Sequence, residues 1–160
     1  MPVANVEGGE PIEQYRERVY AYELYHQLRS RWRDDWPYSL GGEIDKRGHA
    51  VVRGGYLDNA KPDLLVHVPG DMGHNLVVVE IKPLKPDTLP REREAFERDL
   101  QKLIAFRQIG YEAAFMIVFG ESIDRVLDYG EQLRRTGVRV DLVELYHRRR
   151  SKEPANHIEW

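Results

Sequence analysis

Three charged residues, Asp63, Glu80 and Lys82, stand beside short apolar runs, where a charged side chain needs a partner. Glu80 and Lys82 are two positions apart in the β-branched stretch 75–82, which predicts a strand, so their side chains leave the same face. Asp63 opens a second predicted strand at 63–68. Two carboxylates and an ammonium group on one surface could bind a cation and stabilise negative charge on a substrate.

The loop between the two strands predicts how they face one another. Residues 69–74 are dense in turn formers, which indicates that the strands run antiparallel. If Val68 pairs with Asn75, Asp63 lies directly opposite Glu80, with the two Cβ atoms about 4.5–5.5 Å apart. A slip of one residue would place the carboxylates on opposite faces. Because like charges directly opposite each other are destabilising, the pair predicts a cation between them.

The residue types restrict which cation fits. The chain of 160 residues has no cysteine, and its six histidines show no pair at ligand spacing, which argues against zinc. Mg²⁺ prefers carboxylates, water and phosphate oxygens, so this composition can build a hard oxygen site. An ordinary salt bridge among Asp63, Glu80 and Lys82 is the alternative at this stage. The formal net charge of −3 argues against a protein that coats nucleic acid by bulk charge alone.

The elements around these strands predict a mixed α/β (α+β) fold in a single domain over residues 1–160. We expect a loose leader at 1–10 and a polar, basic tail at 148–160. There is no signal-peptide pattern and no apolar run long enough for a membrane span, so we expect a cytoplasmic protein. Helices are predicted at 11–33, 91–109 and 122–136, and strands at 38–46, 63–68, 75–82, 113–119 and 138–146.

The motif residues resemble those of a known nuclease superfamily. Pro62-Asp63, followed after sixteen residues by Glu80-Ile81-Lys82, is similar to the motif of the PD-(D/E)xK nucleases, which share the restriction-endonuclease-like fold. The predicted order also matches the core of that superfamily, a helix, three strands, a helix and a further strand, and the resemblance covers residues 12–145. It implies a central mixed sheet flanked by helices.

The resemblance implies roles for the motif residues. Asp63 and Glu80 would bind Mg²⁺, with Mn²⁺ as a substitute, and the backbone carbonyl of Ile81 would be a further ligand. Lys82 would position or activate the attacking water and offset charge near the scissile phosphate. The chain would then be a divalent-metal-dependent nuclease, an endonuclease rather than an exonuclease, hydrolysing phosphodiester bonds in DNA.

Members of this superfamily often add a glutamate from the first helix, and Glu23 is the candidate. It shares a helical stripe with Val19, Tyr22 and His26, and a carboxylate on an otherwise apolar face is costly unless it is paired or bound. Glu17 lies on another face and is the weaker choice. The alternative interpretation of Glu23 is an ion pair with Lys82 or Arg16.

Several further residues are secondary candidates. Glu43 and Gln101 are auxiliary site candidates, and nucleic-acid contacts are expected from Lys102 and from the basic cluster Arg148, Arg149 and Arg150. Small members of the fold often pair to cut two strands, so the resemblance allows a homodimer. Two other interpretations remain open: a catalytically silent module on the same fold that binds nucleic acid or protein, and an unrelated α/β protein with an accidental motif.

Overall fold

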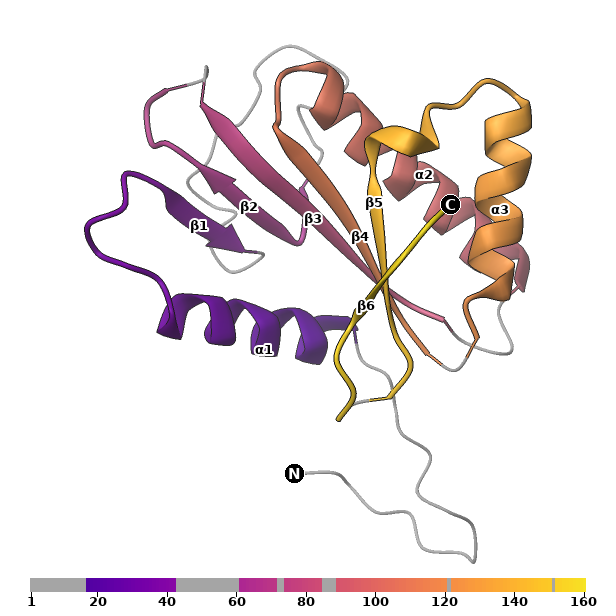
Figure 1. Cartoon of the computed structure of the whole chain (residues 1–160), viewed down its shortest axis with the longest axis horizontal. Coiled ribbons are helices and arrows are strands. Elements are labelled where there is room, and N and C mark those ends of the chain that lie inside the picture. The colour runs from indigo at the N-terminus through magenta and orange to yellow at the C-terminus, as the bar shows by residue number, and fades with distance from the viewer. Residues whose placement is uncertain (1–16, 43–60, 72–73, 85–88, 121, 151) are drawn as a thin grey trace, which may run out of the picture.

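The computed structural model describes residues 17–42, 61–71, 74–84, 89–120, 122–150 and 152–160. Within them the chain forms a mixed α/β fold, with a six-stranded sheet of order β1-β2-β3-β4-β5-β6 and three α-helices (Figure 1). The helices are α1 (Glu17–Ser30), α2 (Leu89–Gln108) and α3 (Asp124–Arg135), and the strands are β1 (Ser39–Gly42), β2 (Leu64–His67), β3 (Asn75–Pro83), β4 (Ala113–Phe119), β5 (Glu144–Arg148) and β6 (Asn156–Ile158).

The sheet is antiparallel at both margins and parallel in its centre. The pairs β1–β2, β2–β3 and β5–β6 are antiparallel, whereas β3–β4 and β4–β5 are parallel, with α2 and α3 as their connections. The predicted order of helices and strands is confirmed, and β6 is an additional strand. None of the described helices is long and apolar enough to cross a membrane.

The register that matters for the motif is also confirmed. Leu64 pairs with Val79 and Leu65 with Val78, which continues to Asp63 opposite Glu80. The hairpin end differs from the prediction, because an irregularity after Val66 shifts the last pairs of the ladder by one position. This bulge lies at the far end of the strands, so it leaves the two carboxylates on one face.

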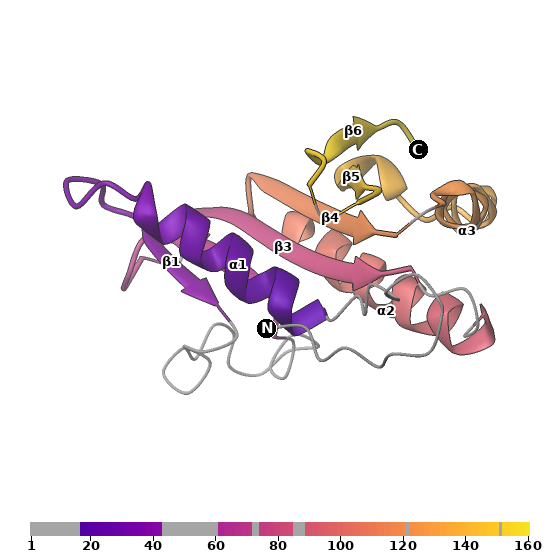
Figure 2. The same ribbon diagram turned by 90° about the horizontal axis from the view of Figure 1, so that it is seen from below.

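Alternate side chains of the central strands enter two separate cores. The larger core joins Val78, Met116 and Val118 to the apolar faces of α2 and α3, and the smaller one joins Val79 and Ile81 to α1. Because successive strand residues point to opposite faces, α1 covers one face of the sheet and the other two helices cover the other. Figure 2 shows α2 running along the twisted strands β3 and β4.

The sheet covers only one of the two apolar stripes of α1. Val19 and Tyr22 are 61% and 43% exposed, while Ala21 is buried and Leu24 and Leu28 pack on the smaller core. Both stripes are apolar, and the sheet receives the one that carries the small Ala21 at its centre. Residues 1–16 and 43–60, where the predicted leader, the start of this helix and the end of the first strand fall, lie outside the described residues.

The predicted polar tail contains a strand and an aromatic contact that were not predicted. Residues 156–158 form β6 on β5, and Trp160 packs against Phe96 with ring centroids 6.1 Å apart. The indole Nε1 of Trp160 donates a hydrogen bond to the carbonyl of Val143 at 2.5 Å. The last predicted strand begins later than expected. Residues 140–142 form a 3₁₀ turn, and β5 begins only at Glu144.

Candidate functional site

Asp63, Glu80 and Lys82 lie on one face of the sheet, as the strand spacing predicts, and this is the face that α2 covers. Asp63 and Glu80 are buried, with 7% and 3% of their surface exposed. The Oδ2 atom of Asp63 accepts a hydrogen bond of 2.7 Å from the backbone N–H of Ile81. This bond ties the start of β2 to the end of β3 and orients the Asp63 carboxylate beside Glu80.

Helix α2 supplies two further charged side chains to the same place. Lys102 Nζ lies 2.5 Å from Glu80 Oε1 and 3.2 Å from Asp99 Oδ1, and Lys82 Nζ lies 2.6 Å from Asp99 Oδ2. Asp99 is 6% exposed. It bridges the two lysines, so the site is a buried network of carboxylates and ammonium groups between β3 and α2. We call Asp63, Glu80, Lys82, Asp99 and Lys102 the carboxylate–lysine cluster.

The electrostatics of the cluster favour extra positive charge. Burial, together with the charges of Asp63 and Asp99, raises the pKa of Glu80 from 4.5 to about 8, although Lys102 opposes the rise. For Lys82, burial lowers the pKa, but the hydrogen bond and charge of Asp99, with Glu17 and Glu80, outweigh it and raise the value. Lys82 is therefore a cation at neutral pH. The pKa of Lys102 is raised in the same way, against the effect of burial, by Glu80 and Asp99.

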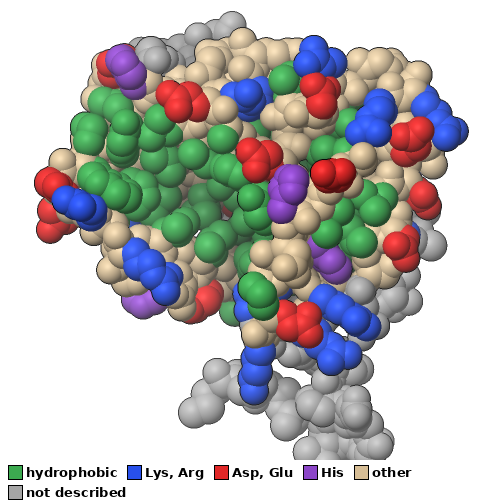
Figure 3. Space-filling view, in the orientation of Figure 1, with side chains coloured by type: hydrophobic (Ala, Val, Ile, Leu, Met, Phe, Trp, Pro, Cys, Tyr) green, Lys and Arg blue, Asp and Glu red, His purple; other side chains and the backbone are tan. Residues whose placement is uncertain are grey.

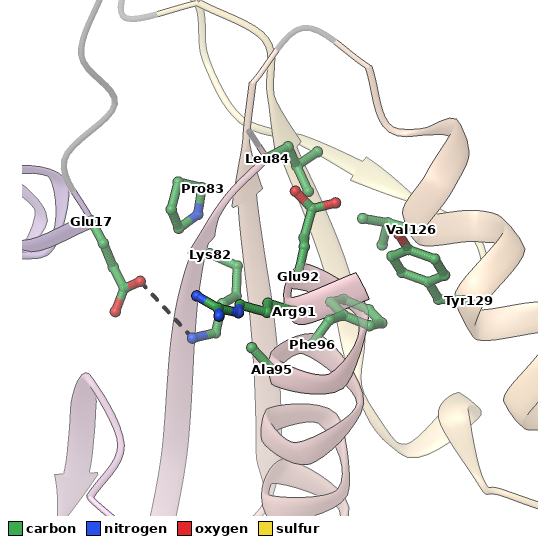
Figure 4. Close-up of a pocket in the computed structure, with 10 residues that line it drawn as sticks. All are labelled: Glu17, Lys82, Pro83, Leu84, Arg91, Glu92, Ala95, Phe96, Val126 and Tyr129. Carbon is green, nitrogen blue, oxygen red and sulfur yellow. Dashed lines mark ion pairs between the residues drawn. The ribbon is translucent and has the colours of Figure 1, made fainter. Parts of the chain in front are cut away.

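A first-helix carboxylate does reach the cluster, but it is Glu17 and not Glu23. Glu17 Oε2 lies 3.9 Å from Lys82 Nζ (Figure 4), whereas Glu23 is exposed and accepts a hydrogen bond of 2.6 Å from the Gln27 side chain. The prediction of Glu23 is wrong because it followed the exposed stripe of α1. Glu17 is one turn before Ala21, on the stripe of α1 that packs against the sheet.

The other predicted residues divide between the cluster and the surface. Lys102 is a member of the cluster, with 15% of its side chain exposed, so it is not the open phosphate contact that the sequence suggested. Gln101, its neighbour on α2, is exposed and points away from the buried face. Glu43 lies outside the described residues. The carbonyl of Ile81 belongs to a fully buried residue in the parallel ladder, and its role as a ligand stays a prediction.

Sequence reasoning missed Asp99. The buried face of α2 includes Phe96, Leu100 and Leu103, and Asp99 falls on that face by helical spacing. An acidic residue on a buried helical stripe is costly without a partner. The same argument that was applied to Glu23 could therefore have found Asp99.

The basic cluster Arg148, Arg149 and Arg150 begins at the end of β5, and it lies at the same end of the parallel strands as Lys82. Because β3, β4 and β5 are parallel, their C-terminal ends meet there, and Val118 of β4 pairs with both Lys82 and His147. The guanidinium of Arg148 sits 5.2 Å from the ring centroid of Tyr20 on α1. Arg149 and Arg150 are exposed, and Lys and Arg side chains gather at the lower edge of the molecule, around the β5–β6 turn (Figure 3).

The acidic side chains in and beside the cluster offer oxygen donors, the atom type that hard divalent cations prefer. Asp63, Glu80, Asp99 and Glu17 are four carboxylates against two lysines, which leaves a net charge of −2 when all are ionised. Glu80 Oε1 is buried and lies 2.5 Å from Lys102 Nζ. In their present arrangement the described residues contain no group of three or more His, Asp or Glu side chains placed to hold a metal.

No protein-family model and no curated protein matches this chain. Any assignment of function therefore depends on the geometry of the carboxylate–lysine cluster and on the motif that forms it.

Proposed function

We propose that this protein is a divalent-metal-dependent nuclease with a restriction-endonuclease-like core. The observation that carries the proposal is the buried pair Asp63 and Glu80, opposite each other on adjacent strands, with Lys82 two residues further on the same face. Burying two carboxylates side by side is costly unless a cation offsets them. The motif at Asp63 and at Glu80-Ile81-Lys82 supports the same assignment.

Asp63 and Glu80 would hold Mg²⁺ or Mn²⁺, and the cation, when bound, would activate water and neutralise charge on the phosphate oxygens. The chain's own residues prepare that site. The Ile81 N–H fixes the orientation of the Asp63 carboxylate through its hydrogen bond of 2.7 Å. Lys82 stays protonated because Asp99 contacts it at 2.6 Å, so it can stabilise negative charge that develops on a phosphate. Arg149 and Arg150 are the exposed cations at the same edge that could contact the nucleic-acid backbone.

A catalytically silent module on this fold is the second candidate, and one observation favours it. Lys102 and Lys82 contact Glu80 and Asp99 at 2.5 and 2.6 Å, so protein cations already offset part of the carboxylate charge. A protein that no longer needed the metal could keep this network for stability alone. Such a protein would bind nucleic acid or another protein without cleaving anything.

A cleavage assay distinguishes the two candidates. Single-stranded DNA, duplex DNA and RNA are each incubated with the protein in Mg²⁺, in Mn²⁺ and in EDTA. The nuclease proposal expects cleavage with either metal and none in EDTA, loss of cleavage in Asp63→Asn, and cleavage by the control Asp35→Asn, whose carboxylate is exposed and paired with Arg33 at 2.7 Å. Cleavage in EDTA, or full activity of Asp63→Asn, would overturn it. Binding without any cleavage would select the silent module.

A further inference from the structure

Lys102 comes from α2, outside the motif strands, yet its ammonium group contacts one of the two carboxylates of the proposed metal site. Lys102 Nζ lies 2.5 Å from Glu80 Oε1, and only 15% of the lysine side chain is exposed. Asp63 and Glu80 are both buried, and neighbouring buried carboxylates are costly unless a positive charge offsets them. Lys102 therefore supplies part of the positive charge that the proposed function assigns to a metal ion.

The two lysines of the cluster differ in the carboxylate that each one contacts most closely. Lys82 Nζ lies 2.6 Å from Asp99 Oδ2 and 3.9 Å from Glu17 Oε2. Lys102 Nζ is closest to Glu80, and its distance to Asp99 Oδ1 is 3.2 Å. A cation that replaced Lys102 on Glu80 would therefore leave both contacts of Lys82 in place.

Asp99 offers Lys102 a second carboxylate. It lies one helical turn before Lys102 on α2, within ion-pair distance of the same ammonium group. Because a lysine side chain is a flexible four-carbon stem, the ammonium group can leave Glu80 and stay paired with Asp99. This movement avoids an isolated buried charge, and it frees an oxygen of Glu80. Ionised Asp63 and Glu80 then carry two negative charges, which a divalent cation matches.

We propose that Lys102 is the internal counter-ion of the metal site, and that Mg²⁺ or Mn²⁺ displaces it from Glu80 on binding. The inference rests on the proposed nuclease function, and it deepens that function by naming a residue that sets the metal affinity. Lys102 weakens metal binding, because the metal ion must break the contact between Lys102 and Glu80 and approach a like charge. A lysine with a structural role alone would stabilise the fold and leave the metal affinity unchanged.

The test measures binding of Mn²⁺ to the full chain at pH 8 by calorimetry, without nucleic acid, so it does not depend on cleavage. Lys102→Met keeps the length of the side chain and removes its charge, and we expect it to bind Mn²⁺ about tenfold more tightly than the wild type. Loss of the positive charge also favours a proton on Glu80. A divalent ion gains about twice as much as a proton, because the Coulomb energy is proportional to the charge.

Lys82→Met is the matched control. It removes the same charge from the same cluster, but from a side chain whose closest carboxylate is Asp99. We expect a smaller gain in Mn²⁺ affinity from this variant than from Lys102→Met. An equal gain in the two variants would show a general effect of charge and would overturn the inference, as would unchanged or weaker binding in Lys102→Met.

A measurement on the wild type makes the test independent of the folding of either variant. Ammonium groups that are buried and paired exchange their protons slowly, so NMR of ¹⁵N-labelled lysine can follow Lys82 and Lys102 in EDTA. Addition of Mg²⁺ should shift and broaden the signal of Lys102 more than that of Lys82, which keeps its contact with Asp99. If Mg²⁺ shifts the backbone amide of Ile81 and leaves the Lys102 signal unchanged, the inference is wrong.

The binding data also separate this inference from the nuclease function. If neither the wild type nor Lys102→Met binds Mn²⁺, the metal site and the nuclease function fail together. If both proteins bind Mn²⁺ equally and the wild type cleaves DNA, only the role of Lys102 is wrong. If Lys102→Met binds Mn²⁺ more tightly but the wild type cleaves nothing, the role of Lys102 stands and the nuclease function fails.

Discussion

Glu80 predicts an unusual dependence of stability on pH. In the folded protein burial and neighbouring carboxylates raise the pKa of Glu80 to about 8, whereas in the unfolded chain the value is the ordinary 4.5. Between these two pH values the folded state holds a proton that the unfolded state has released. The stability contributed by this group therefore falls as pH rises through that window.

The size of the effect follows from the two pKa values. At about 1.4 kcal/mol per pH unit, the rise to about 8 corresponds to about 5 kcal/mol as an upper bound over the whole window. The pKa values of Lys82 and Lys102 are raised, so both lysines stay protonated throughout. Glu80→Gln removes this titration and keeps the shape of the side chain. Relative to the wild type, the variant should become steadily more stable from pH 5 to pH 8.

The assay is urea unfolding of both proteins in EDTA at pH 5, 6, 7 and 8, followed by circular dichroism. Taking the difference between the two proteins removes every titration that they share, and Glu23→Gln, the same change at an exposed site, is the control. A difference that does not vary with pH would refute the electrostatic argument. The opposite slope would show that the ion pair with Lys102 dominates the pKa of Glu80.

Two further predictions concern Glu17 and Gly130. Glu17→Gln should lower the rate of metal-dependent cleavage about tenfold, because Glu17 helps to hold Lys82. This loss is equivalent to about 1.4 kcal/mol of transition-state stabilisation. The control Glu23→Gln should leave the rate unchanged. Equal rates in the two variants would contradict the assignment of Glu17. Gly130→Ala should destabilise the fold by about 1–3 kcal/mol in thermal unfolding, because its Cβ would lie 2.6 Å from the Trp160 ring. Gly41→Ala, whose Cβ would meet only the Leu65 carbonyl at 3.9 Å, is the control, and equal melting temperatures would show that Trp160 does not pack on α3.

The face-to-face placement of Asp63 and Glu80 could be predicted because a short hairpin has few registers. Strand alternation and a turn-rich loop leave one register that buries both apolar runs, and Leu64 does pair with Val79. The bulge near His67 does not follow from these rules, but it lies too far along the strand to move the carboxylates.

The face of α1 could not be chosen from its sequence. Val19 with Tyr22 and Ala21 with Leu24 form two apolar stripes, and which one is buried depends on how closely the helix approaches the sheet. The choice decided between Glu23 and Glu17. The packing of Trp160 could not be predicted either. Its ring lies against Gly130, where no side chain intervenes, and the sequence does not distinguish this glycine from other helical positions.

The nuclease assignment is tested most directly by the anomalous difference map of a crystal soaked in Mn²⁺. We expect a peak within coordination distance of carboxylate oxygens of both Asp63 and Glu80. We also expect Lys102 Nζ, which lies 2.5 Å from Glu80 Oε1, to move away from that oxygen when Mn²⁺ binds. A map with no peak at this position, and with Lys102 still on Glu80, would contradict the assignment of the carboxylate–lysine cluster as a metal centre.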